Sequence, residues 1–188
     1  MNYSEAKKII KDCEKSAQNL FAELQDISLY NQEKVLNAFR ENNVTYAHFN
    51  GSTGYGYDDI GREKLNKVYA TVFGCEEALV SPLITNGTHA LTLALFGLLR
   101  PNDVMLSVVD KPYDTLDDVI NGKNNGSLKE YGIIYKQTDL DENAMPDLTA
   151  IAKMTAEIKP KLAFIQRSKG YLWRNALSIE EIAEIIDI

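Results

Sequence analysis

The segment Leu83-Ile84-Thr85-Asn86-Gly87-Thr88-His89-Ala90 joins the end of an apolar run to the start of an apolar-periodic helix. A strand that leads through a glycine-containing turn into a helix is a basic unit of α/β proteins. The first turn of such a helix carries backbone N–H groups without an intrahelical partner and the positive end of the helix dipole, which together favour an anion such as phosphate. Asn86, Gly87 and Thr88 are therefore a candidate anion site, although such junctions also occur in α/β proteins that bind no anion.

The rest of the chain after this segment alternates between two hydrophobic periods. Short apolar runs predict strands at residues 78–83, 104–108, 132–136 and 162–166. Apolar residues at helical spacing predict helices at residues 87–99, 112–120 and 146–157. This alternation indicates an α/β fold with a mostly parallel sheet covered by helices.

The N-terminal residues are predicted to form a helical arm followed by a loop. Helical spacing of apolar residues begins at Ser4, a candidate N-cap, and continues to residue 24, and a second helix is expected over residues 29–40. A further amphipathic helix ends at Gly74. We therefore expect an arm and loop over residues 1–57 and a larger α/β domain over residues 58–188.

Residues 178–188 begin a capped amphipathic helix that lacks a terminal Gly, Pro or basic last turn. A helix that covers a parallel sheet normally leads into another strand. We therefore expect a truncated larger domain, and the alternative is a helix that frays at a natural C-terminus.

Composition limits the class of protein. The chain has 188 residues, 45% of them hydrophobic, and a formal net charge of −7. No apolar run approaches the ~18 residues of a membrane span, and the acidic balance argues against a nucleic-acid partner. The start resembles no secretory signal, and two cysteines are too few for a disulfide framework, so we expect a cytoplasmic protein with Cys13 and Cys75 buried.

Three further segments could carry chemistry. Residues 51–63 combine glycines with Tyr55, Tyr57 and Arg62, which could donate to a phosphate or form an ordinary turn. Tyr113 follows a predicted strand, so its ring could stack on a planar cofactor or cap the sheet. Residues 166–174 contain three cations, which suit an anion or a solvated loop. No His, Cys or carboxylate spacing matches a metal site, and no dinucleotide, Walker A or serine-hydrolase motif is present.

Several motifs together resemble those of the aluminium-resistance family, a branch of the pyridoxal-phosphate-dependent enzymes of Cys/Met metabolism related to cystathionine lyases and methionine gamma-lyase. The resemblance runs from about residue 46 to the end and rests on five motifs: Ser52-Thr53-Gly54-Tyr55-Gly56-Tyr57-Asp58-Asp59-Ile60-Gly61-Arg62, Asn86-Gly87-Thr88-His89-Ala90-Leu91, Leu98-Leu99-Arg100-Pro101-Asn102-Asp103, Lys111-Pro112-Tyr113-Asp114-Thr115-Leu116 and Gln166-Arg167-Ser168-Lys169-Gly170-Tyr171.

The resemblance implies an aspartate-aminotransferase-like fold (type I) and a role for each motif. In such enzymes Asn86, Gly87 and Thr88 would hold the phosphate of pyridoxal phosphate, and Tyr113 would stack on its ring. Tyr55, Tyr57 and Arg62 would reach the phosphate in a neighbouring subunit, which implies a homo-oligomer, a dimer or tetramer. Arg167 and Ser168 would contact the cofactor or the substrate.

The implied function is that of the N-terminal part of a carbon-sulfur lyase acting on a sulfur-containing amino acid. The family's Schiff-base lysine and the aspartate that pairs with the pyridine nitrogen have no counterpart in the 188 residues, because Lys169 matches a different position. We therefore expect this chain to be inactive alone, without the small C-terminal domain. The alternatives are a non-catalytic remnant or partner subunit, and a phosphometabolite-binding module.

Overall fold

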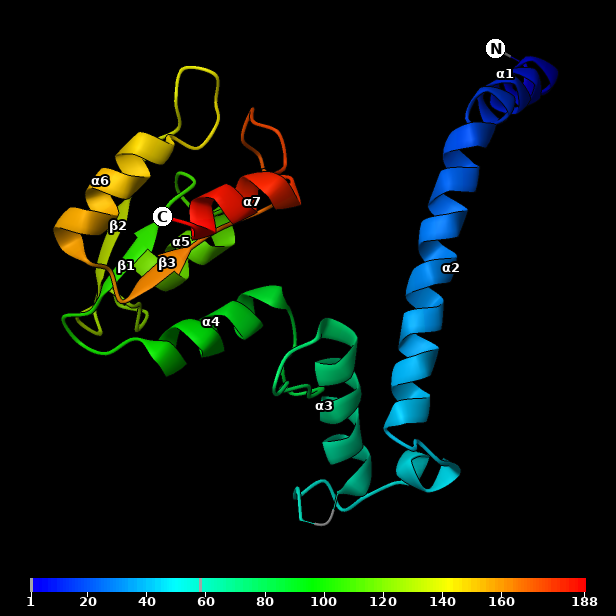
Figure 1. Cartoon of the computed structure of the whole chain (residues 1–188), viewed down its shortest axis with the longest axis horizontal. Helices are drawn as coiled ribbons and strands as arrows, with labels where there is room; N and C mark the ends of the chain where they lie inside the picture. The colour runs from blue at the N-terminus through cyan, green and yellow to red at the C-terminus, as the bar shows by residue number, and fades with distance from the viewer. Residues whose placement is uncertain (1, 58) are drawn as a thin grey trace. The chain divides into compact units, whose positions relative to one another are not determined.

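The computed structural model describes residues 2–57 and 59–188, and Figure 1 shows its helices and strands along the chain. The residues group into two compact units, one extending to Leu83 and the other from Ile84 to Ile188. The expected boundary of the large domain, at residue 58, falls outside the described residues. Helix α3 (Ile60–Phe73) groups with the arm helices in the first unit.

The arm of the first unit consists of α1 (Tyr3–Ser16) and α2 (Gln18–Glu41), followed by a 3-10 turn η1 (Tyr46–Phe49). The N-cap of α1 is Asn2, whose side chain accepts from the backbone N–H of Glu5 while the Glu5 carboxylate accepts from Asn2 in return. The prediction that Ser4 is the cap was therefore wrong. Both residues are good caps, and the reciprocal bond with a glutamate three residues on favours Asn2.

The helices of the arm are divided at Ala17, and the predicted gap between residues 24 and 29 does not exist. No Gly or Pro occurs in that gap, so nothing there ends the helix. Only Ala38 is buried in α2, and α1 has no buried residue. Cys13 and Cys75 are exposed, which contradicts their expected burial, because Cys13 lies on the solvated arm and Cys75 follows the end of α3.

Helix α3 has a defined start and end. The Asp59 side chain accepts from the backbone N–H of Arg62, and Gly74 adopts the left-handed conformation (φ 65°) that commonly ends a helix. After it, residues 78–83 form no strand, contrary to the prediction. The backbone N–H of Val80 donates instead to the Asn66 side chain on α3 at 2.8 Å, and no neighbouring strand in the described part of the chain is available for pairing.

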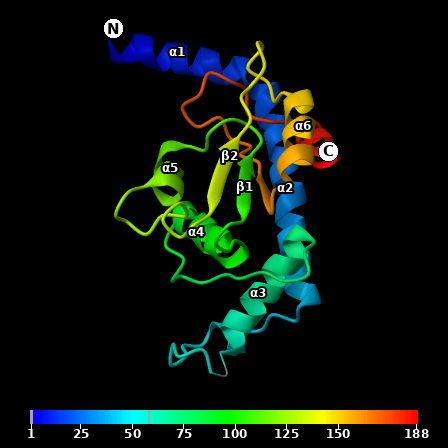
Figure 2. The ribbon, with the colours of Figure 1, turned by 90° about the vertical axis from the view of Figure 1, so that its left-hand side faces the viewer.

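The second unit is a parallel sheet covered by helices, as the alternation predicts (Figures 1 and 2). Its strands are β1 (Val104–Ser107), β2 (Ile134–Gln137) and β3 (Leu162–Phe164), in the order β2-β1-β3. Its helices are α4 (Gly87–Leu98), α5 (Asp114–Asn121), α6 (Leu148–Ile158) and α7 (Ile179–Ile186). In register, Met105 lies beside Tyr135 on one strand and Leu162 on the other.

The core of this unit has two layers, one on each face of β1. Met105 packs in a buried cluster with Leu95 of α4 and Leu116 of α5, whereas Leu106 packs with Ile151 of α6 and Ile185 of α7. Successive residues of a strand point to opposite faces, so the alternation along β1 supplies both layers. Burial on both faces explains why β1 reads as a continuous apolar run.

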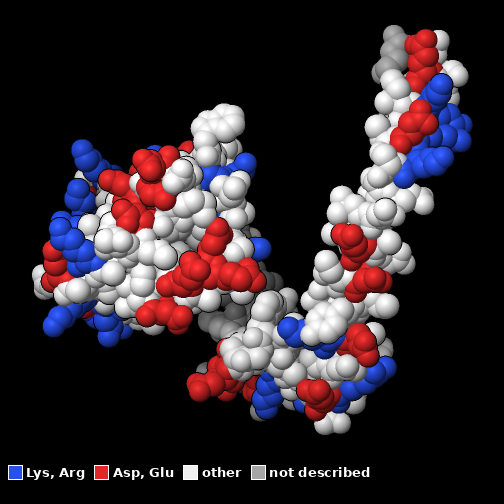
Figure 3. All heavy atoms as spheres, turned by 45° about the horizontal axis from the view of Figure 1, so that its top comes forward, with Lys and Arg blue, Asp and Glu red and all other residues white. Residues whose placement is uncertain are grey.

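Two further findings concern the ends and surface of the chain. Ser178 caps α7 in a reciprocal bond with Glu181, as its sequence predicts. Figure 3 shows acidic and basic side chains interspersed on the visible face of the second unit, and a group of Lys and Arg side chains near the N-terminal end of the arm. No helix among residues 2–57 and 59–188 combines the length and apolar character needed to cross a membrane.

Candidate functional site

The N-terminus of α4 has the geometry of an anion site. The Asn86 side chain accepts from the backbone N–H of His89 at 2.8 Å and caps the helix. The N–H groups of Gly87 and Thr88 make no hydrogen bond to the described residues. A Cβ placed at Gly87 would meet nothing within 4 Å, so space lies open in front of these donors. Free N–H groups, open space and the positive end of a helix dipole together favour an anion here.

Thr88 links this helix terminus to Tyr113. The Thr88 hydroxyl lies 2.9 Å from the Tyr113 hydroxyl and 3.2 Å from the Thr115 hydroxyl. Hydrogen bonds from Thr115 and from Thr88 lower the pKa of Tyr113, and partial burial opposes them. Tyr113 follows the carboxyl end of β1 and immediately precedes α5, so the structure brings together the predicted Thr88 and Tyr113 from separate segments.

The loop after β3 (residues 166–174) also reaches Tyr113. The Gln166 side chain accepts from the Tyr113 backbone N–H at 3.0 Å and donates to the carbonyl of Ser168 at 3.0 Å. Gly170 has a φ of 55°, and a Cβ there would lie 3.4 Å from Cβ of Tyr113. A glycine therefore allows the loop to adopt a left-handed conformation close to the tyrosine. Gln166, Lys169 and Tyr171 line one small pocket with Tyr113.

Arg174 fixes the shape of this loop from inside. Arg174 is 4% exposed, and its guanidinium donates to the carbonyls of Gln166 at 2.8 Å, Ser168 at 2.7 Å and Asn175 at 2.8 Å. Burial lowers the pKa of Arg174, and the nearby Asp110 opposes that shift. Three carbonyls replace the water that a guanidinium would otherwise bind. Arg174 therefore orders the loop, and its N–H groups are mostly used by the chain itself.

The predicted residues Arg167 and Ser168 lie on the same loop and are exposed. Arg167 donates through Nε to the carbonyl of Leu177 at 3.0 Å. The Ser168 carbonyl is held by Gln166 and Arg174, and its hydroxyl has no partner in the described part of the chain. The Ser168 hydroxyl and the remaining guanidinium nitrogens of Arg167 can therefore contact a ligand.

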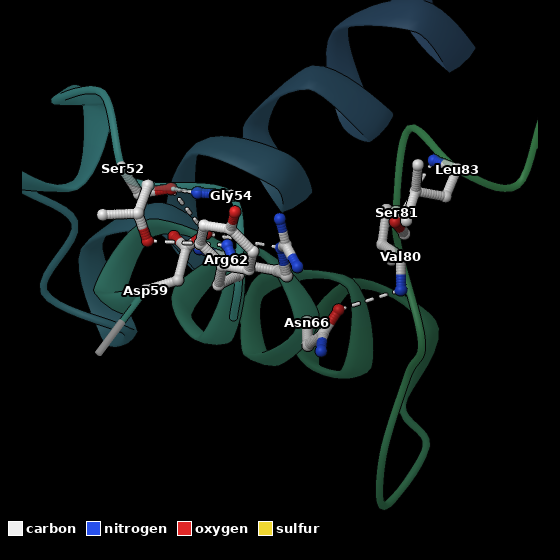
Figure 4. Close-up of polar contacts among 10 residues, drawn as sticks. Ser52, Gly54, Asp59, Arg62, Asn66, Val80, Ser81 and Leu83 are labelled. Carbon is white, nitrogen blue, oxygen red and sulfur yellow. Dashed lines mark hydrogen bonds and ion pairs between the residues drawn. The ribbon is translucent and has the colours of Figure 1, made fainter. Parts of the chain in front are cut away.

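The other predicted residues belong to the first unit: Tyr55 and Tyr57 lie in the loop before α3, and Arg62, shown in Figure 4, lies in the first turn of α3. Tyr55 and Tyr57 are 84% and 83% exposed. Arg62 pairs with Asp59, with 3.4 Å between Nε and the carboxylate, and Asp59 also accepts from the Ser52 hydroxyl at 2.9 Å. The backbone bond from Arg62, the bond from Ser52 and the charge of Arg62 lower the pKa of Asp59, against a small desolvation effect. The loop therefore offers two exposed phenols, and the first turn of α3 offers a partly paired cation.

The sequence interpretation missed the residues that position the site. Thr115, Gln166 and Arg174 were not among the predicted site residues, although all three lie within the quoted motifs or the cationic segment. The position of Gln166 directly after β3 is a usable signal, because side chains at carboxyl ends of parallel strands converge. Nothing in the sequence indicates that Arg174 is buried. His89 accepts through Nδ1 from the Thr85 backbone at 3.3 Å, which fixes the ring at the turn.

Among the described residues, no group of three or more His, Cys, Asp or Glu side chains is placed to hold a metal ion. The fold and the site define an α/β protein with a candidate anion site where a helix N-terminus meets the carboxyl edge of a parallel sheet. The chain belongs to the methionine gamma-lyase family, whose family model matches residues 6–188.

Comparison with known proteins identifies bacterial relatives over nearly the whole chain. "Uncharacterized protein YnbB" of Bacillus subtilis (strain 168) is 45% identical over 185 residues, which are 96% of this chain and 43% of that protein. The crystal structure of a "carbon-sulfur lyase involved in aluminum resistance" from Clostridium novyi NT is 50% identical with a TM-score of 0.89, covering 98% of this chain and 44% of that one.

A second crystal structure, of a "putative cystathionine beta-lyase involved in aluminum resistance" from Clostridium acetobutylicum, is 45% identical with a TM-score of 0.90, covering 98% of this chain and 44% of that chain. This chain therefore spans less than half the length of these relatives. The match confirms the predicted family.

Proposed function

We propose that this chain forms the phosphate-binding part of a pyridoxal-phosphate-dependent carbon-sulfur lyase that acts on a sulfur-containing amino acid. The observation that carries the proposal is the N-terminus of α4 at Gly87. Its first N–H groups have no partner among the described residues and face open space, and the Thr88 hydroxyl beside them contacts the hydroxyl of Tyr113. The names of the similar structures support the lyase activity and its association with aluminum resistance.

The residues of the second unit fit the cofactor. The phosphate would accept from the N–H groups of Gly87 and Thr88, because a helix N-terminus binds a phosphate dianion through such donors. Tyr113 is partly exposed and tethered beside them, so its ring can stack on a planar heterocycle. When bound, pyridoxal phosphate supplies an electron-withdrawing pyridine ring that stabilises negative charge developing at the α-carbon of an amino acid.

The remaining site residues have supporting roles in the proposal. Gln166 and Arg174 hold the loop of Arg167 and Ser168 against Tyr113, so these two side chains face a ligand from a fixed backbone. Fixed donors are effective because little entropy is lost when the ligand binds. We propose that Tyr55, Tyr57 and Arg62 donate to the phosphate bound by a neighbouring subunit of a homo-oligomer, since their exposed hydroxyl and guanidinium groups suit a phosphate.

Substitution of Gly87 tests the phosphate site directly. Gly87→Val places a branched side chain in the open space before the free N–H groups, so we expect it to abolish the rise in melting temperature that pyridoxal phosphate gives the purified protein. Gly97→Val is the matched control, because Gly97 lies in the same helix and is equally unobstructed. It should keep the rise, although it makes the same exchange of glycine for a β-branched residue within α4.

The choice of ligands separates the functions under consideration. Pyridoxal lacks the phosphate, so it should stabilise the protein much less than pyridoxal phosphate does, and inorganic phosphate should stabilise it weakly. Equal stabilisation of the Gly87→Val variant and the control would contradict the proposed site. If inorganic phosphate or an unrelated phosphometabolite matches pyridoxal phosphate, the chain is a phosphate-binding module without preference for the cofactor.

The lyase activity is tested separately on the full-length protein. With pyridoxal phosphate and a sulfur-containing amino acid, we expect release of ammonia and of a thiol in equal amounts. Cofactor binding without either product would leave the binding site standing and contradict the lyase proposal.

A further inference from the structure

The chain contains Asn–Gly pairs in four places, and the structure holds them very differently. The pairs are Asn50–Gly51, Asn86–Gly87, Asn121–Gly122 and Asn125–Gly126. An asparagine followed by glycine is chemically labile, because the next backbone nitrogen can attack the side-chain amide and glycine has no Cβ to hinder the approach. The attack requires a free asparagine side chain, a free N–H on the glycine and a backbone that can rotate.

In the two pairs near α5, hydrogen bonds hold both reacting groups. Asn121 donates through Nδ2 to the Asp117 carboxylate at 2.8 Å, and the N–H of Gly122 donates to the carbonyl of Asp118 at 3.0 Å. Asn125 likewise donates through Nδ2 to the carbonyl of Asp118 at 3.1 Å. The N–H of Gly126 donates to the Glu130 carboxylate at 2.9 Å. Reaction at either pair therefore needs local opening.

Asn86 is held on one side only. Its Oδ1 accepts from the backbone N–H of His89, which keeps the side chain directed at the first turn of α4. The N–H of Gly87 has no partner among the described residues, so this pair is intermediate between the others. Attack of the Gly87 nitrogen on Cγ of Asn86 would require the side chain to leave its capping position, which opposes the reaction.

Asn50–Gly51 is the unprotected pair. Asn50 follows η1 with an extended backbone (φ −68°, ψ 146°), and it is exposed. Its side chain and the N–H of Gly51 have no hydrogen-bond partner in the part of the chain that the structure describes. A Cβ at Gly51 would meet nothing within 4 Å, so the loop has room to rotate. The backbone bond of Asn50, to the carbonyl of Ala47, is long at 3.3 Å.

We propose that Asn50–Gly51 is a site of spontaneous deamidation in the folded protein, whereas hydrogen bonds protect the pairs Asn121–Gly122 and Asn125–Gly126. The backbone nitrogen of Gly51 forms a bond to Cγ of Asn50, the Cγ–Nδ2 bond breaks, and ammonia leaves with the proton of the backbone nitrogen. Water then adds to one of the two carbonyl carbons of the cyclic imide and opens it to aspartate or isoaspartate. Water is the only co-reactant.

The modification changes the charge of the loop that follows. Asn50 lines one pocket with Ser52, Tyr57 and Asp59. Asp59 is already an anion at neutral pH, so a carboxylate at residue 50 adds a second negative charge to this pocket. Isoaspartate also inserts a methylene group into the backbone ahead of the loop. If Tyr55 and Tyr57 bind phosphate as proposed above, both products weaken that binding, because like charges repel.

The test is peptide mapping of the purified native protein after incubation in mildly alkaline buffer. Conversion is read by the mass change of each Asn–Gly peptide and by enzymatic methylation of isoaspartate. We expect the Asn50 peptide to convert about tenfold or more faster than the Asn121 and Asn125 peptides, whose reaction needs local opening. In denaturant, all four peptides should convert at similar rates. This readout does not depend on phosphate or cofactor binding. The deamidation proposal can therefore fail while the proposed function holds, and the reverse is also true.

Two variants complete the test. Gly51→Ala restores a Cβ in open space and should slow conversion at residue 50 strongly, and Asn50→Gln should prevent it, with the other peptides unchanged in both. The proposal is overturned if the Asn121 or Asn125 peptide converts in the native protein as fast as the Asn50 peptide. It is equally overturned if Asn50 stays intact under conditions in which the denatured chain reacts.

Discussion

The hydroxyl cluster of Thr88, Tyr113 and Thr115 ties the start of α4 to the start of α5 through side chains alone. A hydrogen bond donated to a phenolate oxygen favours the ionised form of the phenol, whereas burial disfavours it. The two threonines outweigh burial at Tyr113, and its pKa is lowered as a result. The acidity of this phenol therefore reports directly on the local geometry of the candidate site.

Removing a hydroxyl from this cluster should raise the pKa of Tyr113. We expect Thr115→Val and Thr88→Val each to raise it toward the ordinary value of 10.0, because both hydroxyls contribute to lowering it. The measurement is a pH titration of the Tyr113 ring resonance in isotope-labelled protein, assigned with Tyr113→Phe. An unchanged titration in both variants would show that the cluster does not form in solution.

Most candidate residues could be predicted from the sequence, whereas the hydrogen bonds that hold them in position could not. Asn86, Gly87 and Thr88 were identified from an apolar run, a turn and a helical period, and all three lie at the start of α4. The bond from Gln166 to the backbone of Tyr113 joins residues 53 positions apart. A contact of that range depends on the packed sheet, and neither spacing nor propensity contains it.

Among the elements, the loop after β3 depends on one buried side chain. Replacement of the buried Arg174 by Met would remove the donor to the carbonyls of Gln166 and Asn175 and would leave the carbonyl of Ser168 with Gln166 as its only donor among the described residues. Hydrogen bonds from a charged donor are stronger than those from a neutral one, and three are lost here, so we expect Arg174→Met to lower the free energy of unfolding by about 2–4 kcal/mol. The measurement is urea unfolding followed by circular dichroism.

Arg167→Met is the matched control for this change. Arg167 is exposed and donates to a single carbonyl, that of Leu177, so its loss should cost about 1 kcal/mol or less. Arg174→Lys keeps the charge but cannot reach three carbonyls as a planar guanidinium does. Its free energy of unfolding should therefore lie between those of the two Met variants. Equal stability of both Met variants would contradict the role assigned to Arg174.

The capping of α1 gives a second prediction for an element. Asn2→Ala removes the side chain that accepts from Glu5 and should destabilise the first turn of α1 by about 1 kcal/mol, whereas Ser4→Ala lies inside the helix and should change little. Amide hydrogen exchange in the first turn measures both. Faster exchange in Ser4→Ala than in Asn2→Ala would indicate that Ser4 is the N-cap, as the sequence predicted.

Elements with a strong local signal were predicted well, and those that depend on a neighbour were not. The end of α3 at Gly74 and the capping box at Ser178 follow from residue type and are confirmed. The apolar run at residues 78–83 has the composition of a strand, yet Val80 bonds to a side chain of α3. Strand formation requires a paired neighbour, and the sequence of a segment does not say whether one is present.

For the molecule as a whole, two carboxylates make stability depend on acidity. Backbone N–H groups of Asn124 and Gly126 lower the pKa of Glu130, and the bonds from Arg62 and Ser52 lower the pKa of Asp59. A carboxylate whose pKa is lower in the folded state stabilises the fold above its unfolded pKa. The ordinary pKa is 4.5 for Glu130 and 3.8 for Asp59, and the pKa of each is lower in the folded protein. The stabilisation is therefore lost as the pH falls from the ordinary pKa through the lower pKa of the folded state.

Glu130→Gln should therefore be less stable than the parent at neutral pH and should lose less stability on acidification. Both effects have one cause, since a neutral amide side chain accepts more weakly than a carboxylate and does not titrate. Urea midpoints measured between neutral pH and about pH 3 test this expectation. Glu142→Gln, at an exposed position without hydrogen bonds to the described residues, should follow the parent. Parallel curves for all three proteins would contradict the role of Glu130.

The position of β1 in the middle of the sheet has a kinetic consequence. β1 pairs with β2, in the register Met105↔Tyr135, and with β3, in the register Met105↔Leu162, so both of its partners are distant in the sequence. Contacts between distant residues form slowly because a long loop must close first, whereas isolated helices form in about a microsecond. Refolding should therefore be biphasic: the arm helices α1 and α2 gain structure early, and β1 keeps an unpaired edge, which is prone to aggregation, until both β2 and β3 have paired with it.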